Sequence, residues 1–484
     1  MVTVLGANSV TGGFEVDNSL RFNDGSSDHL LIAPSGAGNL KTWTWSAWVK
    51  RAQLGTRQLL FSGYDQAAGL GESIEFTADD KLEYDLDIAG TDNTVTSAML
   101  FRDPSAWYNI VFVKDLTQGT ETDRIKVFVN GVQISLVEAG NGYPGQNATS
   151  GLINAAGNYE HHIGTLNSAA EFFDGYMSEV VFIDGTANDE EDFGEFDSDS
   201  GIWKPIKVSG LTFGTNGFYL EFKASGTSQN SSGLGADTSG NDNHLAVANL
   251  TAVDQSTDTC TNNFNTLNSL AARGSSGTTL SEANLQYSAV ADGGDSSVFG
   301  TIGIPPGMKV YFEVKLVQNT AQNSIGIHNL YDGGDGDFVK GGSEAGTYSF
   351  KPRGASSVTQ YFNNGSANNH DVNNVANGTI LGVAIDNDNG QIHYHIAGTY
   401  INSSDPTDNN PVALVTGFGG ASEQYIHVSL DTSGGTEPIN QFNFGSPMHS
   451  ISSSNADANG HGNFEFAVPS GYFALCTKNL AEHG

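Results

Sequence analysis

Basic residues are scarce in this sequence. Its 484 residues include 20 Lys and Arg against 54 Asp and Glu, which gives a formal net charge of −34. Proteins hold phosphate backbones and anionic lipid through Lys and Arg. The shortage therefore argues against nucleic acid and anionic membranes as partners. The acidic excess fits a well-solvated surface, cation binding or a salty medium.

Cysteine and long apolar runs are also lacking. The two cysteines, Cys260 and Cys476, lie far apart, whereas small secreted scaffolds carry more cysteines at closer spacing. Residues 1–20 contain neither a basic region nor a long apolar core, and no apolar run approaches the ~18 residues of a membrane-spanning helix. We therefore expect no signal peptide, no membrane insertion and assembly in a reducing cytoplasm.

Nucleotide and metalloprotease motifs are absent, and so is a nucleophile elbow. What the sequence does contain is glycine (60), phenylalanine (27) and tyrosine (16). Short runs alternate in polarity, as in TWTWSAWVKR at residues 42–51, where Trp43 and Trp45 share one face. Asn130-Gly131 between two apolar runs predicts a hairpin. The pattern predicts an all-β protein of short antiparallel strands.

Strand-like runs fill both halves of the chain, and an acidic and then asparagine-rich region lies between them. Asn and Asp side chains bond to nearby backbone amides, so such a region can be ordered without strands. A flexible linker would be richer in Gly and Ser and would not carry Phe264 and Leu267. We predict two tandem β-sandwiches, residues 1–190 and residues 271–484, joined by an ordered connector over residues 191–270.

Several segments resemble known families. WTWSAWVKR, WYNIVFVKD and FFDGYMSEVVFIDG are similar to a laminin-G-like domain of the concanavalin A-like superfamily. LGADTSGNDNH and DTCTNNFNTLNSL resemble a segment of bacteriophage virion proteins, usually described as tail-fibre or related structural proteins. The final third, with GVAIDNDNGQIHY and QFNFG, is similar to a SPRY-like domain.

The resemblance implies a non-enzymatic bacteriophage structural protein exposed on the virion as a tail fibre, spike or head decoration. Such a protein would bind a host-surface glycan or protein during adsorption, and its other partners would be virion proteins. By analogy with phage fibres we expect a homotrimer, although no heptad repeat supports one. The implied location is the virion, after assembly in the host cytoplasm. A purely structural virion component is the alternative without receptor binding.

An enzymatic alternative rests on Glu83, Asp85 and Asp87, which alternation places on one face of a strand. Glucanases of the concanavalin A-like superfamily present their nucleophile and acid/base in such a row, and retaining hydrolysis needs two carboxylates about 5 Å apart. The third position here is Asp instead of the Glu of that pattern, so its reach is shorter. The competing interpretation is the polar, solvent-facing side of a laminin-G strand.

Calcium is the one cofactor that the resemblance suggests. Laminin-G-like domains often hold a calcium ion at a sheet rim, and calcium prefers carboxylate and carbonyl oxygens. Asp65 and Asp174 are the candidate ligands, and Asp174 directly precedes a glycine at the edge of an expected strand. The spacing of these residues alone does not define a site.

Overall fold

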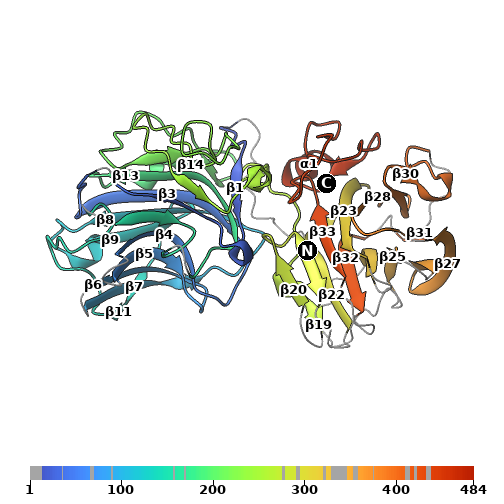
Figure 1. The fold of residues 1–484 in the computed structure, drawn as a ribbon, viewed down its shortest axis with the longest axis horizontal. Coiled ribbons are helices and arrows are strands. Elements are labelled where there is room, and N and C mark those ends of the chain that lie inside the picture. The colour runs from blue at the N-terminus through green and yellow to red at the C-terminus, as the bar shows by residue number, and fades with distance from the viewer. Residues whose placement is uncertain are drawn as a thin grey trace. The chain divides into compact units, whose positions relative to one another are not determined.

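The structure is a computed structural model, in which the chain groups into two compact units. The N-terminal unit comprises Gly6–Asn262, and the C-terminal unit contains Asn263–Gly484. Both units are built almost entirely of antiparallel strands, which confirms the predicted fold class (Figure 1). The residues described are 13–34, 36–65, 70–88, 91–155, 159–167, 170–274, 278–289, 295–319, 323–328, 346–352, 358–373, 375–408, 415–418, 422–431 and 438–484.

Two large sheets form the N-terminal unit. The first sheet runs, in spatial order, through β10 (Val132–Gln133), β9 (Ile125–Val129), β8 (Trp107–Asp115), β3 (Thr42–Arg51), β13 (Gly175–Asp184), β1 (Ser19–Phe22) and β18 (Gln255–Ser256), with β16 (Phe218–Leu220) also paired to β13. The second sheet runs through β11 (Leu136–Gly140), β7 (Thr91–Leu100), β6 (Lys81–Ile88), β5 (Leu70–Phe76), β4 (Gln58–Asp65), β12 (Glu160–Ile163), β2 (His29–Ile32) and β17 (Ala246–Ala248). A separate hairpin joins β14 (Gly194–Phe196) to β15 (Trp203–Pro205).

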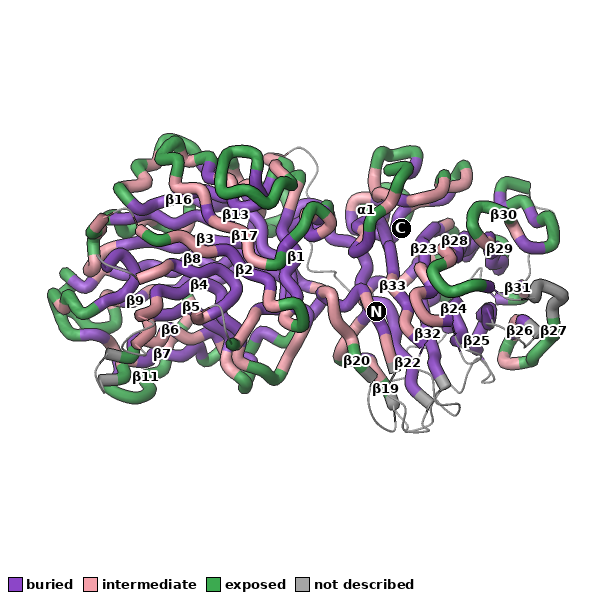
Figure 2. Tube along the Cα trace, viewed as in Figure 1, coloured by how far each residue is buried: buried purple, intermediate pink, exposed green. Residues whose placement is uncertain are grey.

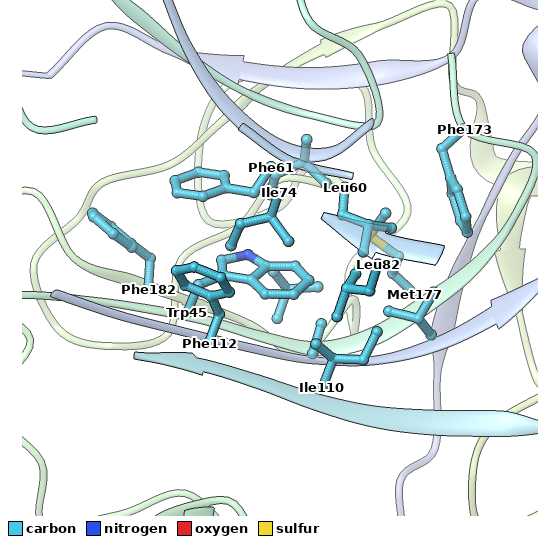
Figure 3. Close-up of a cluster of buried hydrophobic side chains, with 14 of the residues drawn as sticks. Trp45, Leu60, Phe61, Ile74, Leu82, Ile110, Phe112, Phe173, Met177 and Phe182 are labelled. Atoms are coloured by element: carbon cyan, nitrogen blue, oxygen red, sulfur yellow. The ribbon is translucent and has the colours of Figure 1, made fainter. Parts of the chain in front are cut away.

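An aromatic core lies between these two sheets (Figure 3). Trp45 of β3 stacks at 6.3 Å, centroid to centroid, on Phe61 of β4, which also lies 5.1 Å from Phe182 of β13. All three side chains are fully buried. Burial of apolar surface is the main favourable term in folding, at roughly 25 cal/mol per Å². The strands of the unit are mostly buried and its loops mostly exposed, as Figure 2 shows.

Residues 191–262 complete the N-terminal unit. Within them, β16 pairs with β13 of the first sheet and β17 pairs with β2 of the second. The physical reason is that Phe218, Leu245 and Leu250 are buried in the same core as the earlier strands. The structure thus divides the predicted connector, residues 191–270, between the two units instead of leaving it as a separate element.

Buried ion pairs bind the end of this segment to the earlier strands. Lys50 Nζ of β3 lies 2.8 Å from Asp258 Oδ2, with both side chains 1% exposed. Trp107 Nε1 donates to the other oxygen of Asp258 at 3.1 Å. Arg21 of β1 pairs with Asp254 at 2.8 Å. Charges removed from water in this way need partners, so these contacts fix where the segment docks.

Two further sheets form the C-terminal unit. One runs through β19 (Arg273–Gly274), β22 (Asp295–Ile304), β32 (Gln424–Asp431), β24 (Asn323–His328), β25 (Thr347–Lys351), β26 (Val358–Asn363) and β27 (Ser366–Asn373). The other runs through β20 (Thr278–Ser281), β21 (Gln286–Ala289), β33 (Ile439–Asn443), β23 (Lys309–Gln318), β28 (Thr379–Asp386), β29 (Gln391–Ile396) and β30 (Thr399–Tyr400), with β31 (Val415–Thr416) on β29 and β34 (Phe473–Ala474) on β23. A core that includes Phe312, Val383, Tyr394 and Val428 lies between them.

Helical structure is limited to short pieces. The α-helix α1 (Thr477–His483) follows β34, and no helix in the described part of the chain could cross a membrane. The 3-10 turns are Asp24–Ser26, Glu121–Asp123, Glu190–Asp192, Ala252–Asp254, Ser269–Ala271 and Ile401–Ser403.

The two cysteines lie one in each unit. Cys260 and Cys476 are both fully buried, and they are not joined in a disulfide. Burial raises the pKa of the Cys260 thiol well above its usual range. This thiol therefore stays protonated at neutral pH.

Candidate functional site

Glu83, Asp85 and Asp87 lie on the outer face of β6, as alternation predicts. Leu82 and Tyr84 on the same strand point into the core. Glu83 and Asp85 are half-buried and Asp87 is exposed. The strand therefore presents three carboxylates in a row on the side of the second sheet that faces away from the core.

Asp85 shares a hydroxyl group with a second carboxylate. Thr94 Oγ1 on β7 lies 2.9 Å from Asp85 Oδ1 and 2.6 Å from Asp92 Oδ1. A hydroxyl has one hydrogen, so it can donate to only one of them at a time. Burial, followed by the hydrogen bond with Asp92, raises the pKa of Asp85 to about 7. Hydrogen bonds from Thr94 and Asp85 lower the pKa of Asp92.

When the pair holds one proton, that proton therefore favours Asp85 over Asp92. Two carboxyl groups in contact cannot both ionise easily, so their pKa values move apart. Many enzymes use such a pair as a general acid and a base. The same arrangement also offers a neutral hydrogen-bond donor beside an anionic acceptor. Either property can serve a ligand rich in hydroxyl groups.

Glu83 is the next carboxylate along the strand, and its Oε2 accepts a hydrogen bond from Thr96 Oγ1 at 2.8 Å. Burial raises the pKa of Glu83. Directly across on β5 is Glu75, which Arg57 binds through both oxygens, with Nε–Oε1 at 2.5 Å and Nη2–Oε2 at 2.7 Å. Arg57 also reaches Glu171 at 2.8 Å. One cation thus ties this face to the loop that precedes β13.

We call this surface the carboxylate strip. It can accept hydrogen bonds from ligand hydroxyls through its ionised oxygens, and its acidic side chains outnumber its single bound cation. Such a surface attracts neutral polyols or cations and repels anions. The strip is defined by Glu83, Asp85, Asp87 and Asp92, with the buried Glu75 beside them.

The two candidate calcium ligands are not brought together. Asp65 is the last residue of β4. Asp174 is buried just before β13, in a loop that reaches the start of β4 through the Leu59 N–Glu171 O bond of 3.2 Å. Opposite ends of such a strand lie on the order of 20 Å apart. Within the ranges described above, no group of three or more His, Cys, Asp or Glu side chains is placed to hold a metal ion.

The strip contains residues that sequence reasoning did not assign to it. The sequence did not predict that Asp92, Glu75, Arg57, Thr94 and Thr96 lie beside Glu83 and Asp85. The Thr-x-Thr alternation at residues 94–96 could have indicated a polar face next to β6. The partner of each carboxylate depends on the register between β6 and β7, which includes a bulge between Lys81 and Glu83.

Comparison with protein families gives one match. Residues 24–191, which are 168 of the 484 residues, match the family described as the Concanavalin A-like lectin/glucanases superfamily (Laminin_G_3). The match falls within the N-terminal unit, whose two facing antiparallel sheets have that fold. The curated proteins contain no match to the chain.

Solved structures with similar architecture include laminin-G and SPRY domains. Domains LG4-5 of the mouse laminin alpha1 chain align at 8% identity over 92% of both chains, with a TM-score of 0.29. A putative carbohydrate binding protein from Bacteroides ovatus aligns at 14% identity over 45% of this chain and 55% of that one, with a TM-score of 0.29. The SPRY domain of human HERC1 aligns at 9% identity over 34% of this chain and 90% of that one, with a TM-score of 0.25. None of these similarities shows a bacteriophage origin.

Proposed function

We propose that the protein is a non-enzymatic glycan-binding protein exposed on a bacteriophage virion, where it contacts a host-surface glycan or glycoprotein. The observation that carries the binding role is the match of residues 24–191 to a superfamily of lectins and glucanases. The virion role rests on the resemblance of the asparagine-rich segment, residues 237–270, to virion proteins. Sandwich loops and faces vary on a rigid scaffold, which suits recognition of varied surfaces.

The carboxylate strip supports the glycan-binding role. Its ionised oxygens accept hydrogen bonds, so the strip complements the donor character of sugar hydroxyls. Thr94, Thr96 and Arg57 hold the carboxylates in place before a ligand arrives. Preorganised polar groups lose less entropy on binding than free side chains do.

The binding role is tested with the full chain on an array of bacterial surface oligosaccharides. For a bound neutral glycan, we expect Asp85→Asn to weaken affinity about tenfold, because it changes one strong hydrogen bond. Asp242→Asn is the matched control, since the Asp242 side chain is 91% exposed in a loop. Silence of the whole array would oppose glycan binding.

The virion role has a separate test. An antibody against the chain, seen by negative-stain microscopy on intact particles, should label a fixed position such as a fibre, spike or capsid surface. Light scattering of the purified protein tests the trimer, which would multiply weak sugar contacts through effective concentration. A phage that adsorbs normally without the protein, together with array silence, would favour the purely structural role.

A glucanase or depolymerase is the second candidate, because the raised pKa of Asp85, about 7, suits a general acid beside an ionised Asp92. Purified protein incubated with host polysaccharide and with laminarin-type glucans would release reducing sugar. That release should be lost in Glu83→Gln and in Asp85→Asn and retained in Asp242→Asn. No release from any substrate would leave the binding role as the better account.

A further inference from the structure

A hollow lies in the N-terminal unit and is lined by residues outside the carboxylate strip. It is open to solvent, has a volume of about 560 Å³, and lies where the loop before β3 meets the end of β13. This volume is within the roughly 300–1,000 Å³ of small-molecule sites. Its lining residues are Ala37, Gly38, Asn39, Leu40, Lys41, Thr149, Asp184, Gly214 and Thr215.

Asp184 organises the floor of this hollow. Its Oδ1 accepts hydrogen bonds from Asn39 N at 2.7 Å and Asn154 Nδ2 at 3.0 Å. Its Oδ2 accepts from Thr215 N and Asn216 N, both at 3.2 Å. One buried carboxylate thereby joins three loops that are far apart in sequence, and its charge is satisfied by four N–H donors. The hollow is therefore held open by a fixed frame.

Two glycines let the loops approach this frame. A Cβ at Gly38 would lie 2.6 Å from Asp184 Oδ2, and a Cβ at Gly214, where φ is +72°, would lie 2.1 Å from the Asp184 carbonyl oxygen. Only glycine fits both the positive φ and the close approach at position 214. The backbones of both loops therefore pack directly against Asp184.

Lys41 is the cationic side chain among the lining residues, beside the Asp184 carboxylate that N–H groups already satisfy. Its side chain is half-buried at the lining, and none of the ion pairs among the described residues includes it. By contrast, Lys50, Lys114 and Arg57 each bind a carboxylate. In a chain of net charge −34, an ammonium group without an ion pair at a hollow gives an anion a local partner.

We propose that this hollow is a binding site for an acidic saccharide, with the sugar carboxylate at Lys41. The hydroxyls of the sugar face the side chains of Asn39, Thr149 and Thr215, which are all exposed. The choice of a saccharide rests on the proposed glycan-binding function. The carboxylate strip repels acidic sugars, so this class needs a different site, and the hollow is distinct from the strip in both residues and charge.

The experiment measures affinity of the full chain by titration calorimetry for three probes: a glucuronate-containing disaccharide, its neutral glucose counterpart, and glucose 6-phosphate. We expect the glucuronate disaccharide to bind most tightly. Lys41→Gln should weaken it about tenfold, the loss of one charge-assisted contact. Lys207→Gln is the control, because Lys207 is an exposed loop lysine outside the hollow. Salt above ~0.15 M should weaken the acidic sugar more than the neutral one.

A variant that blocks the mouth of the hollow tests whether the saccharide binds inside it. Thr149→Phe places a ring at the exposed mouth and should abolish binding of the glucuronate disaccharide, while Asp85→Asn should not change it. Equal affinity of Lys41→Gln and the wild type would overturn the site while leaving glycan binding at the strip intact. Preference for glucose 6-phosphate would overturn the carboxylate assignment. Failure of all three probes to bind the wild type would overturn this proposal, whereas the proposed glycan-binding function is decided separately on the oligosaccharide array.

Discussion

Buried acidic side chains in the two units are held in two different ways. In the N-terminal unit Asp258 pairs with Lys50, and Glu72 pairs with Lys114 at 2.5 Å with both side chains fully buried, whereas Asp184 accepts bonds from N–H groups. In the C-terminal unit, Glu313 is fully buried and receives only neutral donors. These are the N–H groups of Glu465, Phe466 and Asn443 and the hydroxyl of Tyr311.

Basic residues are also distributed unevenly between the two units. Of the 20 Lys and Arg, 13 lie in residues 1–262 and 7 in residues 263–484. A carboxylate paired with a cation stays ionised, whereas burial among neutral donors raises the pKa of Glu313. Where a carboxylate pairs with a cation, the free energy of unfolding depends on keeping both charges. Where a carboxyl group is buried among neutral donors, the free energy of unfolding depends on pH.

The largest expected effect comes from breaking a charge pair in the N-terminal unit. Asp258→Ala leaves Lys50 buried without its carboxylate and Trp107 without its acceptor. We expect a loss of about 3–5 kcal/mol in the free energy of unfolding, measured by guanidinium titration with tryptophan fluorescence. Asp242→Asn, at an exposed position whose φ of 58° asparagine tolerates, should change it by less than about 0.5 kcal/mol. Equal effects of the two substitutions would contradict the comparison.

Glu179 is another buried acid of the N-terminal unit that accepts a hydrogen bond from a neutral donor. It lies at a bulge in β13 with φ of 51°, and the Tyr219 hydroxyl donates to it. Burial raises its pKa to about 7. A raised acid pKa gives stability that is full below the unfolded value near 4.3 and is lost as pH rises through about 7.

Glu179→Gln removes the titrating group, so the variant does not lose stability as pH rises through about 7. Its free energy of unfolding relative to wild type should therefore be more favourable at pH 8 than at pH 5, by up to about 3 kcal/mol. Denaturant titrations at both pH values, again with tryptophan fluorescence, measure the difference. A pH-independent effect would show that Glu179 behaves like the cation-paired carboxylates.

Glu313→Gln is the corresponding change in the C-terminal unit. The new amide directs N–H groups at two N–H or O–H donors, which leaves buried polar groups unpaired and costs about 1–3 kcal/mol. Hydrogen exchange measured by mass spectrometry should rise in peptides of β23 and β33, which pair beside Glu313. Unchanged exchange there would contradict the account of neutral donors.

The smallest expected effect is at the partly exposed cation of the carboxylate strip. Arg57→Lys keeps the charge but loses the two parallel bonds to Glu75. We expect a loss of about 1 kcal/mol, with the difference between variant and wild type shrinking in high salt. A loss as large as that of Asp258→Ala would remove the distinction between buried and exposed pairs.

Local patterns predicted much of this fold. The alternation in residues 42–51 gives β3 its bounds and places Trp43 and Trp45 in the core. Asn130 and Gly131 both have positive φ, 49° and 75°, as the predicted hairpin between β9 and β10 requires. Period-two alternation likewise placed Glu83, Asp85 and Asp87 on one face.

Pairings between distant residues could not be predicted in this way. The docking of β17 on β2 joins residues more than two hundred positions apart, and nothing local to residues 246–248 specifies it. The hollow at Lys41 depends on Asp184 gathering donors from three separate loops. Alternation shows which way a side chain faces, but register and loop closure determine what it meets.

The two buried cysteines can report how often the protein around them opens. A thiol reagent can reach Cys260 or Cys476 only when the surrounding unit opens, because both side chains are fully buried. Each unit holds one of them. The rate at which each peptide gains the mass of the reagent therefore reports how often its own unit opens under native conditions. Without any engineered probe, the chain can reveal whether its halves open together or separately.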